Sequence, residues 1–376
     1  MPRNKSLIKY PRFRFKRFLV RVLGRVLLPL VCRVKIEGKE NFPKTGPAIL
    51  VGNHVAVMEP VLLAVFSPRQ VEFVGSVDVP HEPSSKAVMV FYGMIEIFRG
   101  KPERHALNDS LAVVAQGAYL AIFPEGGLWN PGTMKPKSGV AFLSHRSGAP
   151  VVPIGMVGTH GALNAIFAFK RPVLRMVVGK PIPACKVPDG EDPRVVYHQF
   201  SEKVMDHVYE LLPQETLAQM YDVASESFAL MLEANDQTGT RVEIPLEQRI
   251  KHDQALALLL HRPGILKIFR ANLHMPVAPI ERLHERPDTT AVRAAIEPMI
   301  DYLTDEEHGN PYLLTYRFDV DNGRDMLLGL KEWLQLTYWA DEQRLELHLT
   351  PIRRFFSCRK GEEIMQTEQG EFDHWR

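Results

Sequence analysis

Cysteine is scarce in this sequence. Cys32, Cys185 and Cys358 are the only three in 376 residues, and no two of them form a Cys-x2-Cys pair. Neither a disulfide framework nor a cysteine zinc site is therefore indicated, and the chain is typical of a reducing compartment. The five histidines between residues 252 and 308 also lack the regular spacing of metal ligands. We accordingly predict no metal site.

Long apolar runs are also missing. No uninterrupted stretch of about 20 apolar residues is available to cross a bilayer, and no small-residue cleavage site of a signal peptide stands near the start. The sequence shows no internal repeat, low-complexity tract or nucleic-acid-binding motif, so nucleic acid is not expected as a partner. With 45% hydrophobic and 24% charged residues, the chain has the composition of a globular protein of one large or two smaller domains.

Basic charge is concentrated at the front of the chain. Residues 1–40 hold twelve Lys or Arg against two acids, whereas residues 201–376 hold nineteen against thirty-one. Within residues 5–31 the basic residues alternate with large apolar ones, and Arg21, Arg25 and Pro29 interrupt the apolar part. This pattern predicts a basic amphipathic helix in the interface of an anionic membrane, peripheral and on its cytoplasmic face. A helix packed on the protein's own core, or one that touches nucleic acid, is the alternative.

Residues 35–190 alternate short apolar segments with helical ones. We expect strands at 48–51, 71–74, 95–98, 119–123, 151–155 and 174–178. Helices are expected at 60–66, 104–116, 138–147 and 194–212. This alternation predicts an α/β fold with a mainly parallel or mixed sheet flanked by helices.

Three regions are expected along the chain: a membrane-interface segment (1–34), the α/β domain (35–212) and a C-terminal extension (215–376) of α+β or mostly helical structure. In the extension we predict a helix over 215–234, a strand that starts at 312–318, and a turn at 319–323 before a short helix at 325–336. A final strand is expected at 345–349, and residues 361–376 are polar enough to fray. We assign no role to this extension.

The most informative motif follows the strand at 48–51. Asn53 and His54 come directly after it, and Glu59 stands five positions beyond His54, beside a helix that we expect to begin with Pro60. On a continuous helix this spacing would separate the two side chains. In a strand, loop and helix arrangement, the carboxylate can reach back to one imidazole nitrogen, which leaves the other to take a proton from a hydroxyl. An isolated match of this kind is more often a surface histidine beside an unrelated helix cap.

Three later segments strengthen the motif. An apolar strand delivers Arg99 to a loop, where its planar guanidinium suits a phosphate. A second strand ends in Glu125, Gly126 and Gly127, and the glycines allow a substrate to approach the backbone. A third strand contains Pro153. Taken singly, these residues have simpler explanations: an ion pair at a strand end, a solvated turn, and a proline that shapes a sheet edge.

Taken together and in this order, the four segments resemble the blocks of the glycerolipid acyltransferase family, the lysophosphatidic acid acyltransferases and their relatives. Those blocks run Asn-His-x4-Asp, an apolar strand ending in Arg, Phe-Pro-Glu-Gly-Thr-Arg-Ser, and a strand containing Val-Pro. Here they read Asn53-His54-x4-Glu59, Ile97-Phe98-Arg99, Phe123-Pro124-Glu125-Gly126 and Val152-Pro153-Ile154. The resemblance covers about residues 30–210.

The resemblance implies an O-acyltransferase domain at residues 35–212 that moves a fatty acyl chain from acyl-CoA or acyl carrier protein to a lysophospholipid of the 1-acylglycerol-3-phosphate type. His54 would be the general base and Glu59 would orient it. No cofactor is expected beyond the thioester co-substrate, and the partners would be membrane lipids at residues 5–31 and the acyl donor. The implied substrate-binding residues are Asn53, Arg99, Glu125, Gly126, Gly127 and Pro153.

Two departures from the family pattern leave alternatives open. Glu59 stands where the family has aspartate and is one methylene longer, and Gly127 begins the segment where the family often has Thr-Arg-Ser, which removes an arginine. The acceptor could then be a non-glycerolipid alcohol or amine, or the chain could be a decayed, membrane-bound lipid-binding or scaffold protein. Acyl carrier protein also stays open as a partner, although the net charge of -12 over residues 201–376 disfavours docking this acidic protein there.

Overall fold

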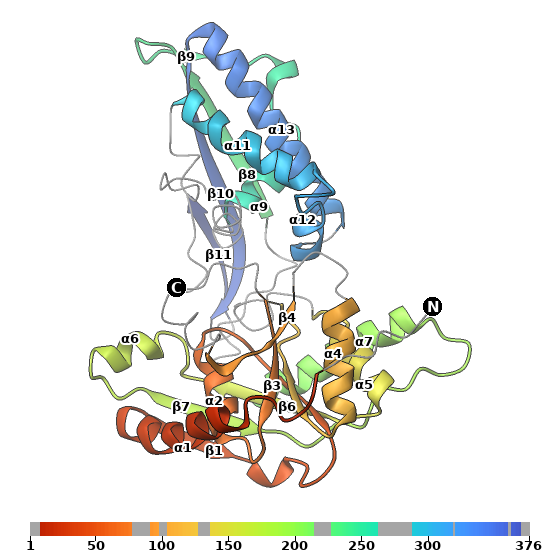
Figure 1. Cartoon of the computed structure of the whole chain (residues 1–376). Coiled ribbons are helices and arrows are strands. Elements are labelled where there is room, and N and C mark those ends of the chain that lie inside the picture. Colours follow the sequence, from red (N-terminus) through yellow and green to blue (C-terminus); the bar gives the residue numbers. More distant parts are fainter. Residues whose placement is uncertain are drawn as a thin grey trace.

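A computed structural model of the chain describes residues 8–76, 91–97, 104–126, 136–213, 227–261, 288–318, 320–359 and 362–369. Its strands form two sheets, one of seven and one of four strands (Figure 1). No helix in the described ranges is both long and apolar enough to span a bilayer.

The seven-stranded sheet has the order β1-β7-β6-β2-β5-β3-β4, and all neighbours are parallel except β6 and β7. The strands are β1 Arg33–Glu37, β2 Ala48–Gly52, β3 Val71–Ser76, β4 Ile95–Ile97, β5 Tyr119–Ile122, β6 Val151–Val157 and β7 Val173–Val178. The predicted mixed α/β sheet is therefore confirmed. The sequence did not suggest β1, because this edge strand lies beside β7 with no fully buried residue and lacks an apolar run.

Helices cover both faces of this sheet. The flanking helices are α1 Arg14–Val31, α2 Met58–Phe66 and α6 Ala162–Phe167 on one face, and α4 Arg104–Ala115, α5 Gly139–Ser147 and α7 Pro193–Tyr209 on the other. A short 3-10 helix, η1 Lys39–Asn41, follows β1. Alternate residues of β2 divide between the two cores, since Leu50 belongs to the α1 and α2 side and Ile49 to the α4 side. Because β2, β5, β3 and β4 are parallel, their carboxyl ends lie at one edge of the sheet.

Helix α2 begins earlier than predicted. It starts at Met58, so Pro60 is its third residue and Glu59 lies inside its first turn. Proline is tolerated there because the first four backbone N–H groups of a helix have no intrahelical partner.

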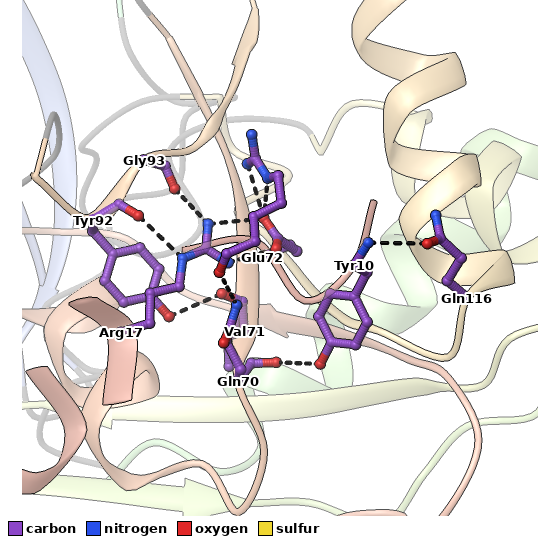
Figure 2. Close-up of polar contacts among 9 residues, drawn as sticks. Tyr10, Arg17, Gln70, Val71, Glu72, Tyr92, Gly93 and Gln116 are labelled. Carbon is purple, nitrogen blue, oxygen red and sulfur yellow. Dashed lines mark hydrogen bonds and ion pairs between the residues drawn. The ribbon is translucent and has the colours of Figure 1, made fainter. Parts of the chain in front are cut away.

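A buried ion pair ties α1 to the sheet. Arg17 and Glu72 are both fully buried, and Arg17 Nη2 lies 2.9 Å from Glu72 Oε2. Figure 2 shows the Arg17 side chain reaching Glu72 of β3 and the carbonyls of Tyr92 and Gly93, at 3.0 and 2.7 Å. The Glu72 carboxylate also accepts hydrogen bonds from Arg12 at 2.9 and 3.1 Å. The first helix is thus held by charge-assisted hydrogen bonds as well as by apolar packing.

Two further arginines of α1 bond to the end of α2. Arg21 donates to the carbonyls of Ser67 and Pro68, and Arg25 donates to those of Val65 and Ser67, at 2.8 to 3.0 Å. The last carbonyls of a helix lack intrahelical donors, so these guanidinium groups supply them. Gly24 permits the close crossing, because a Cβ there would meet Val65 Cγ2 at 2.4 Å.

The second sheet lies in the C-terminal part and has the order β11-β10-β8-β9. It consists of β8 Ser227–Asn235, β9 Arg241–Val242, β10 Glu346–Arg359 and β11 Glu362–Gln369, accompanied by η3 Leu246–Gln248, α9 Asp253–Leu260, α11 Thr289–Thr304, α12 Leu313–Arg317 and α13 Val320–Gln343. All its described strand pairs are antiparallel. This part is α+β, and its core includes Trp333, Leu256 and Ile296.

Several expectations for the C-terminal part were wrong. The helix expected over 215–234 falls partly outside the described residues, and its described part is strand β8, in which Leu230, Leu232 and Ala234 approach the core at the two-residue period of a strand. The strand expected at 312–318 is helix α12, because Leu313 and Leu314 are both buried against α13, as adjacent residues of a strand could not be.

The other corrections concern lengths. We expected a turn at 319–323 and then a short helix, but α13 begins at Val320 and runs for 24 residues. Gly323 does not end this helix; because it has no Cβ, it can lie against the backbone of α12. The expected final strand at 345–349 extends to Arg359 in β10, and β11 follows it within the stretch that we expected to fray. Pairing between β10 and β11 satisfies the backbone of these polar residues, which composition alone could not indicate.

Candidate active site

His54 lies just beyond the end of β2, on the loop that leads to α2. The preceding Asn53 is buried, and its amide makes two 2.8 Å hydrogen bonds with Met156 of β6, one to the carbonyl and one from the N–H. The side chain therefore continues the pairing of β2 with β6 after the strand has ended. These bonds favour a positioning role for Asn53 at the start of the His54 loop.

Glu59 reaches back across this loop to His54. Its Oε2 is 3.3 Å from His54 Nδ1, and its carboxylate accepts hydrogen bonds from the backbone N–H groups of Ala56 at 3.0 Å and Val55 at 3.4 Å. The Glu59 side chain is fully buried, whereas that of His54 is 18% exposed. A carboxylate at the start of a helix is also favoured by the helix dipole. The arrangement fixes one imidazole nitrogen from within and leaves part of the ring accessible.

A second buried carboxylate supports the same loop from the other side. Glu125, which follows β5, accepts a hydrogen bond from the backbone N–H of His54 at 3.0 Å. Its other oxygen accepts one from the hydroxyl of Tyr209, at the end of α7, at 2.9 Å. Glu125 is 1% exposed. Both oxygens are thus bonded to the protein, which favours a role in holding the backbone of His54.

The imidazole of His54 also rests on an aromatic ring. The ring centroids of His54 and Phe123 are 4.2 Å apart, and their planes differ by 22°. Phe123 begins a tight turn in which the N–H of Gly126 donates to its carbonyl at 3.1 Å, and Gly126 has a φ of 69° that disfavours residues with a Cβ. Stacking on one face and the bond to Glu59 together restrict the rotation of the imidazole.

The other residues predicted for the site are placed differently. Arg99 and Gly127 lie outside the described residues. Pro153 is buried in the interior of the sheet in β6, its ring lies against Gly179, and its carbonyl accepts a 2.8 Å hydrogen bond from the Gly179 N–H. These contacts give Pro153 a packing role in the sheet interior instead of the sheet-edge role considered above.

Two supporting residues were not found from the sequence. Tyr209 is 84 positions from Glu125, on a helix without any motif, and no local signal pointed to it. Met156 acts through its backbone, which leaves no trace in its residue type. Phe123 belongs to the Phe-Pro-Glu-Gly motif, but only the fold shows that its ring stacks on the imidazole.

The site has the groups for proton transfer. One partly exposed imidazole is oriented by one buried carboxylate, and a second carboxylate fixes its backbone. Within the described ranges, no group of three or more His, Cys, Asp or Glu side chains gathers in a way that could hold a metal ion. The imidazole and the buried carboxylate bonded to it suit general acid–base chemistry.

Comparisons with known proteins point to the same part of the chain. Residues 33–157 match the family model described as Acyltransferase. The chloroplastic 1-acyl-sn-glycerol-3-phosphate acyltransferase BAT2 of Brassica napus is 26% identical over 152 residues, which cover 39% of this chain and 44% of that protein. The 1-acyl-sn-glycerol-3-phosphate acyltransferase of Borreliella burgdorferi is 24% identical over 140 residues, which cover 36% and 56%. The chain thus spans about half the length of these curated relatives.

One solved structure is also similar. The crystal structure of the 1-acyl-sn-glycerophosphate (LPA) acyltransferase PlsC from Thermotoga maritima aligns with a TM-score of 0.40 and 18% sequence identity, over 52% of this chain and 81% of that chain. The family match includes His54, Glu59 and Glu125 and ends in β6, before α6 and the C-terminal sheet.

Proposed function

We propose that the chain, whose residues 33–157 match the family model described as Acyltransferase, transfers a fatty acyl group from a thioester donor to the free hydroxyl of a lysophospholipid. The acceptor is of the 1-acylglycerol-3-phosphate type, as the names of the two curated relatives suggest. The donor is acyl-CoA or the acyl thioester of acyl carrier protein. The observation that carries the proposal is the bond between the partly exposed imidazole of His54 and the buried carboxylate of Glu59.

The proposed reaction needs one proton to move twice. We assign the Nδ1 proton of His54 to the bond with Glu59, so Nε2 is the nitrogen that accepts the proton of the acceptor hydroxyl. The hydroxyl oxygen attacks the thioester carbonyl carbon, the carbon–sulfur bond breaks, and the imidazolium returns the proton to the leaving thiolate. The products are an ester and a thiol. Glu59 stabilises the transient imidazolium and holds the ring in the reactive tautomer.

The remaining residues divide between positioning and acceptor binding. Asn53 and Glu125 position the His54 loop through bonds to the backbone. We assign acceptor binding to Arg99, Gly126 and Gly127, with the arginine on the acceptor phosphate. Residues 5–31 hold the protein at the cytoplasmic face of the membrane as a peripheral protein, where the lysophospholipid acceptor resides.

Replacing His54 by alanine tests the mechanism. Loss of the general base should lower kcat about 10²- to 10⁴-fold, while the protein stays folded. A matched control is His105→Ala, because His105 is a histidine on α4 whose side chain is 84% exposed and pairs with Asp109. Acyl transfer to lysophosphatidic acid would be followed with labelled acyl-CoA, and circular dichroism would check folding. A His54→Ala variant that acylates as fast as the His105→Ala control would disprove the assigned base.

An acceptor panel tests the substrate class. With one acyl-CoA donor, lysophosphatidic acid should be preferred over neutral monoacylglycerol, an amino-acid lipid and a long-chain alcohol. Preference for an amine or a non-glycerol alcohol would retain the acyl transfer but reject the glycerolipid acceptor. Repeating the panel with acyl carrier protein as donor would identify the thioester.

A further inference from the structure

Helix α1 turns its apolar side chains outward. Arg17, Arg21 and Arg25 bond to the body of the protein, as described above, so these three cations are engaged internally. The large apolar side chains that α1 exposes by 40 to 73% are Phe15, Phe18, Val22, Leu23, Val26, Leu27, Leu30 and Val31. This face is therefore suited to apolar surroundings. The sequence suggested that these three arginines are attracted to lipid phosphates, but this does not fit their hydrogen bonds to the protein.

A second apolar projection follows α6. Phe167 is 70% exposed and Phe169 is 96% exposed. Phe169 has a φ of 55°, in the left-handed region. Its N–H donates to the carbonyl of Ile166 and that of Lys170 donates to Ala165, which is the hydrogen-bond pattern of a helix that ends with glycine in this position. Phenylalanine here is strained, and a 96% exposed ring has little packing to offset the strain.

The two apolar surfaces belong to one flank of the molecule. Arg171 Nη2 donates to the carbonyl of Pro29, near the end of α1, at 2.8 Å. The N–H of Arg33 donates to the carbonyl of Pro172 at 2.8 Å. Residues of α1 and α6 also pack against the same core cluster of the seven-stranded sheet, and both helices lie at the lower left in Figure 1. The loop after α6 is thus tied to the C-terminal end of α1.

We propose that Phe167 and Phe169 insert into the same lipid bilayer as the outer face of α1, so that the protein docks at two points. The occupant is a lipid surface because the phenyl rings are followed at once by an exposed lysine, Lys170, and an apolar tip beside a basic residue suits the boundary between acyl chains and phosphates. Two points of insertion fix the rotation of the domain about α1, which one helix alone would leave free. This inference rests on the proposed function, in which the acceptor is a membrane lipid.

Phe169→Gly tests the second point, because membrane binding and fold stability should change in opposite directions. Glycine removes the strain of the left-handed position, so Tm should rise by about 2–4 °C. Loss of the ring should weaken partition onto vesicles of phosphatidylcholine and phosphatidylglycerol about tenfold or more. Vesicle co-sedimentation of the full chain would measure partition, and calorimetry would measure Tm.

Arg344→Gly is the matched control. Arg344 has a φ of 57° and ends α13 with the same two hydrogen bonds, from its own N–H to Asp341 and from Leu345 to Ala340. It should gain stability in the same way, yet its vesicle partition should equal that of the parent. Equal partition for the Phe169→Gly variant and the parent would overturn the proposal.

Two further results separate the proposal from its alternatives. A dimer of the parent, seen by analytical ultracentrifugation without vesicles and lost in Phe169→Gly, would assign the loop to a protein interface and overturn the proposal. The partition assay needs neither donor nor acceptor, so it is valid even for a chain without transferase activity. A short-chain lysophospholipid below its micellar concentration is an acceptor in solution, so the rate of acyl transfer to it should be equal in Phe169→Gly and the parent. If neither protein transfers an acyl group to it, the proposed function is rejected and the docking proposal is not.

Discussion

The buried ion pair beneath α1 leads to a prediction that can be worked through from its contacts. The fully buried carboxylate of Glu72 pairs with two arginines. Arg17 is also fully buried, whereas the side chain of Arg12 is 18% exposed. Glu72→Gln keeps the shape of the side chain but removes the negative charge. Burial raises the pKa of Tyr92, whose ring lies 4.6 Å from the Arg17 guanidinium, to about 12, so this phenol stays neutral and cannot replace the carboxylate.

The magnitude follows from burial. Removing one partner of a buried ion pair leaves an uncompensated charge and costs about 3–5 kcal/mol. The carbonyls of Tyr92 and Gly93 still solvate Arg17, which places the expected loss at the lower end, about 3 kcal/mol. Glu37→Gln is the matched control, because Glu37 pairs with Arg175 through two 2.8 Å hydrogen bonds in the same sheet but with half its side chain exposed. This exposed pair should contribute little, since water screens it.

Urea unfolding read by hydrogen exchange is the appropriate assay. Peptides that cover α1 and β3 would report the unfolding free energy of the seven-stranded sheet, and peptides from β8 and β10 would serve as an internal reference. A double replacement of Arg17 and Glu72 by methionine should recover much of the loss, because it removes both buried charges. A loss below about 1 kcal/mol for Glu72→Gln, or one equal to that of Glu37→Gln, would show that the buried pair does not hold α1.

Two other predictions concern carboxylates with different tasks. Glu59→Asp shortens the side chain by about 1.5 Å, one carbon–carbon bond. The carboxylate is then drawn away from His54, so kcat should fall about tenfold or more. A large increase in the single-turnover rate would instead indicate a decayed site. The hydrogen bond from Thr289, and then that from Arg293, lowers the pKa of Asp341 below its ordinary value of 3.8. The stabilisation from this carboxylate is present above that ordinary value and is lost as pH falls through the lowered pKa, so Asp341→Asn should lower the urea midpoint at neutral pH but not at pH values below the lowered pKa.

The seven-stranded sheet was largely predictable because its inner strands are short apolar runs. Ile49 and Leu50 are buried on opposite faces of β2, and a strand covered on both faces must be apolar throughout. The same reasoning failed for β1, whose residues are exposed or half-buried, and for β8, where a helix was expected from composition. The partner strand β7, not the local sequence, determines β1, whereas β8 does alternate Leu230, Leu232 and Ala234 toward the core, a strand period that the helical expectation missed.

The candidate site was predictable only as far as its residues lie in contiguous motifs. His54 and Glu59 could be connected because they are five positions apart and flank a strand end. Tyr209 and Met156 reach the same loop from α7 and β6 and could not be found, since a contact over 84 or 103 positions leaves no local pattern.

Glu59 shows how the loop and the acid fit each other. Because α2 begins at Met58 and not at Pro60, Glu59 lies within its first turn. The carboxylate must therefore extend back beyond the N-terminus of the helix to meet His54 and the N–H groups of Val55 and Ala56. The additional methylene supplies that reach. The longer acid is thus accommodated by this helix start, and its three contacts on the loop argue that the departure from the family's aspartate retains an orienting carboxylate beside the imidazole.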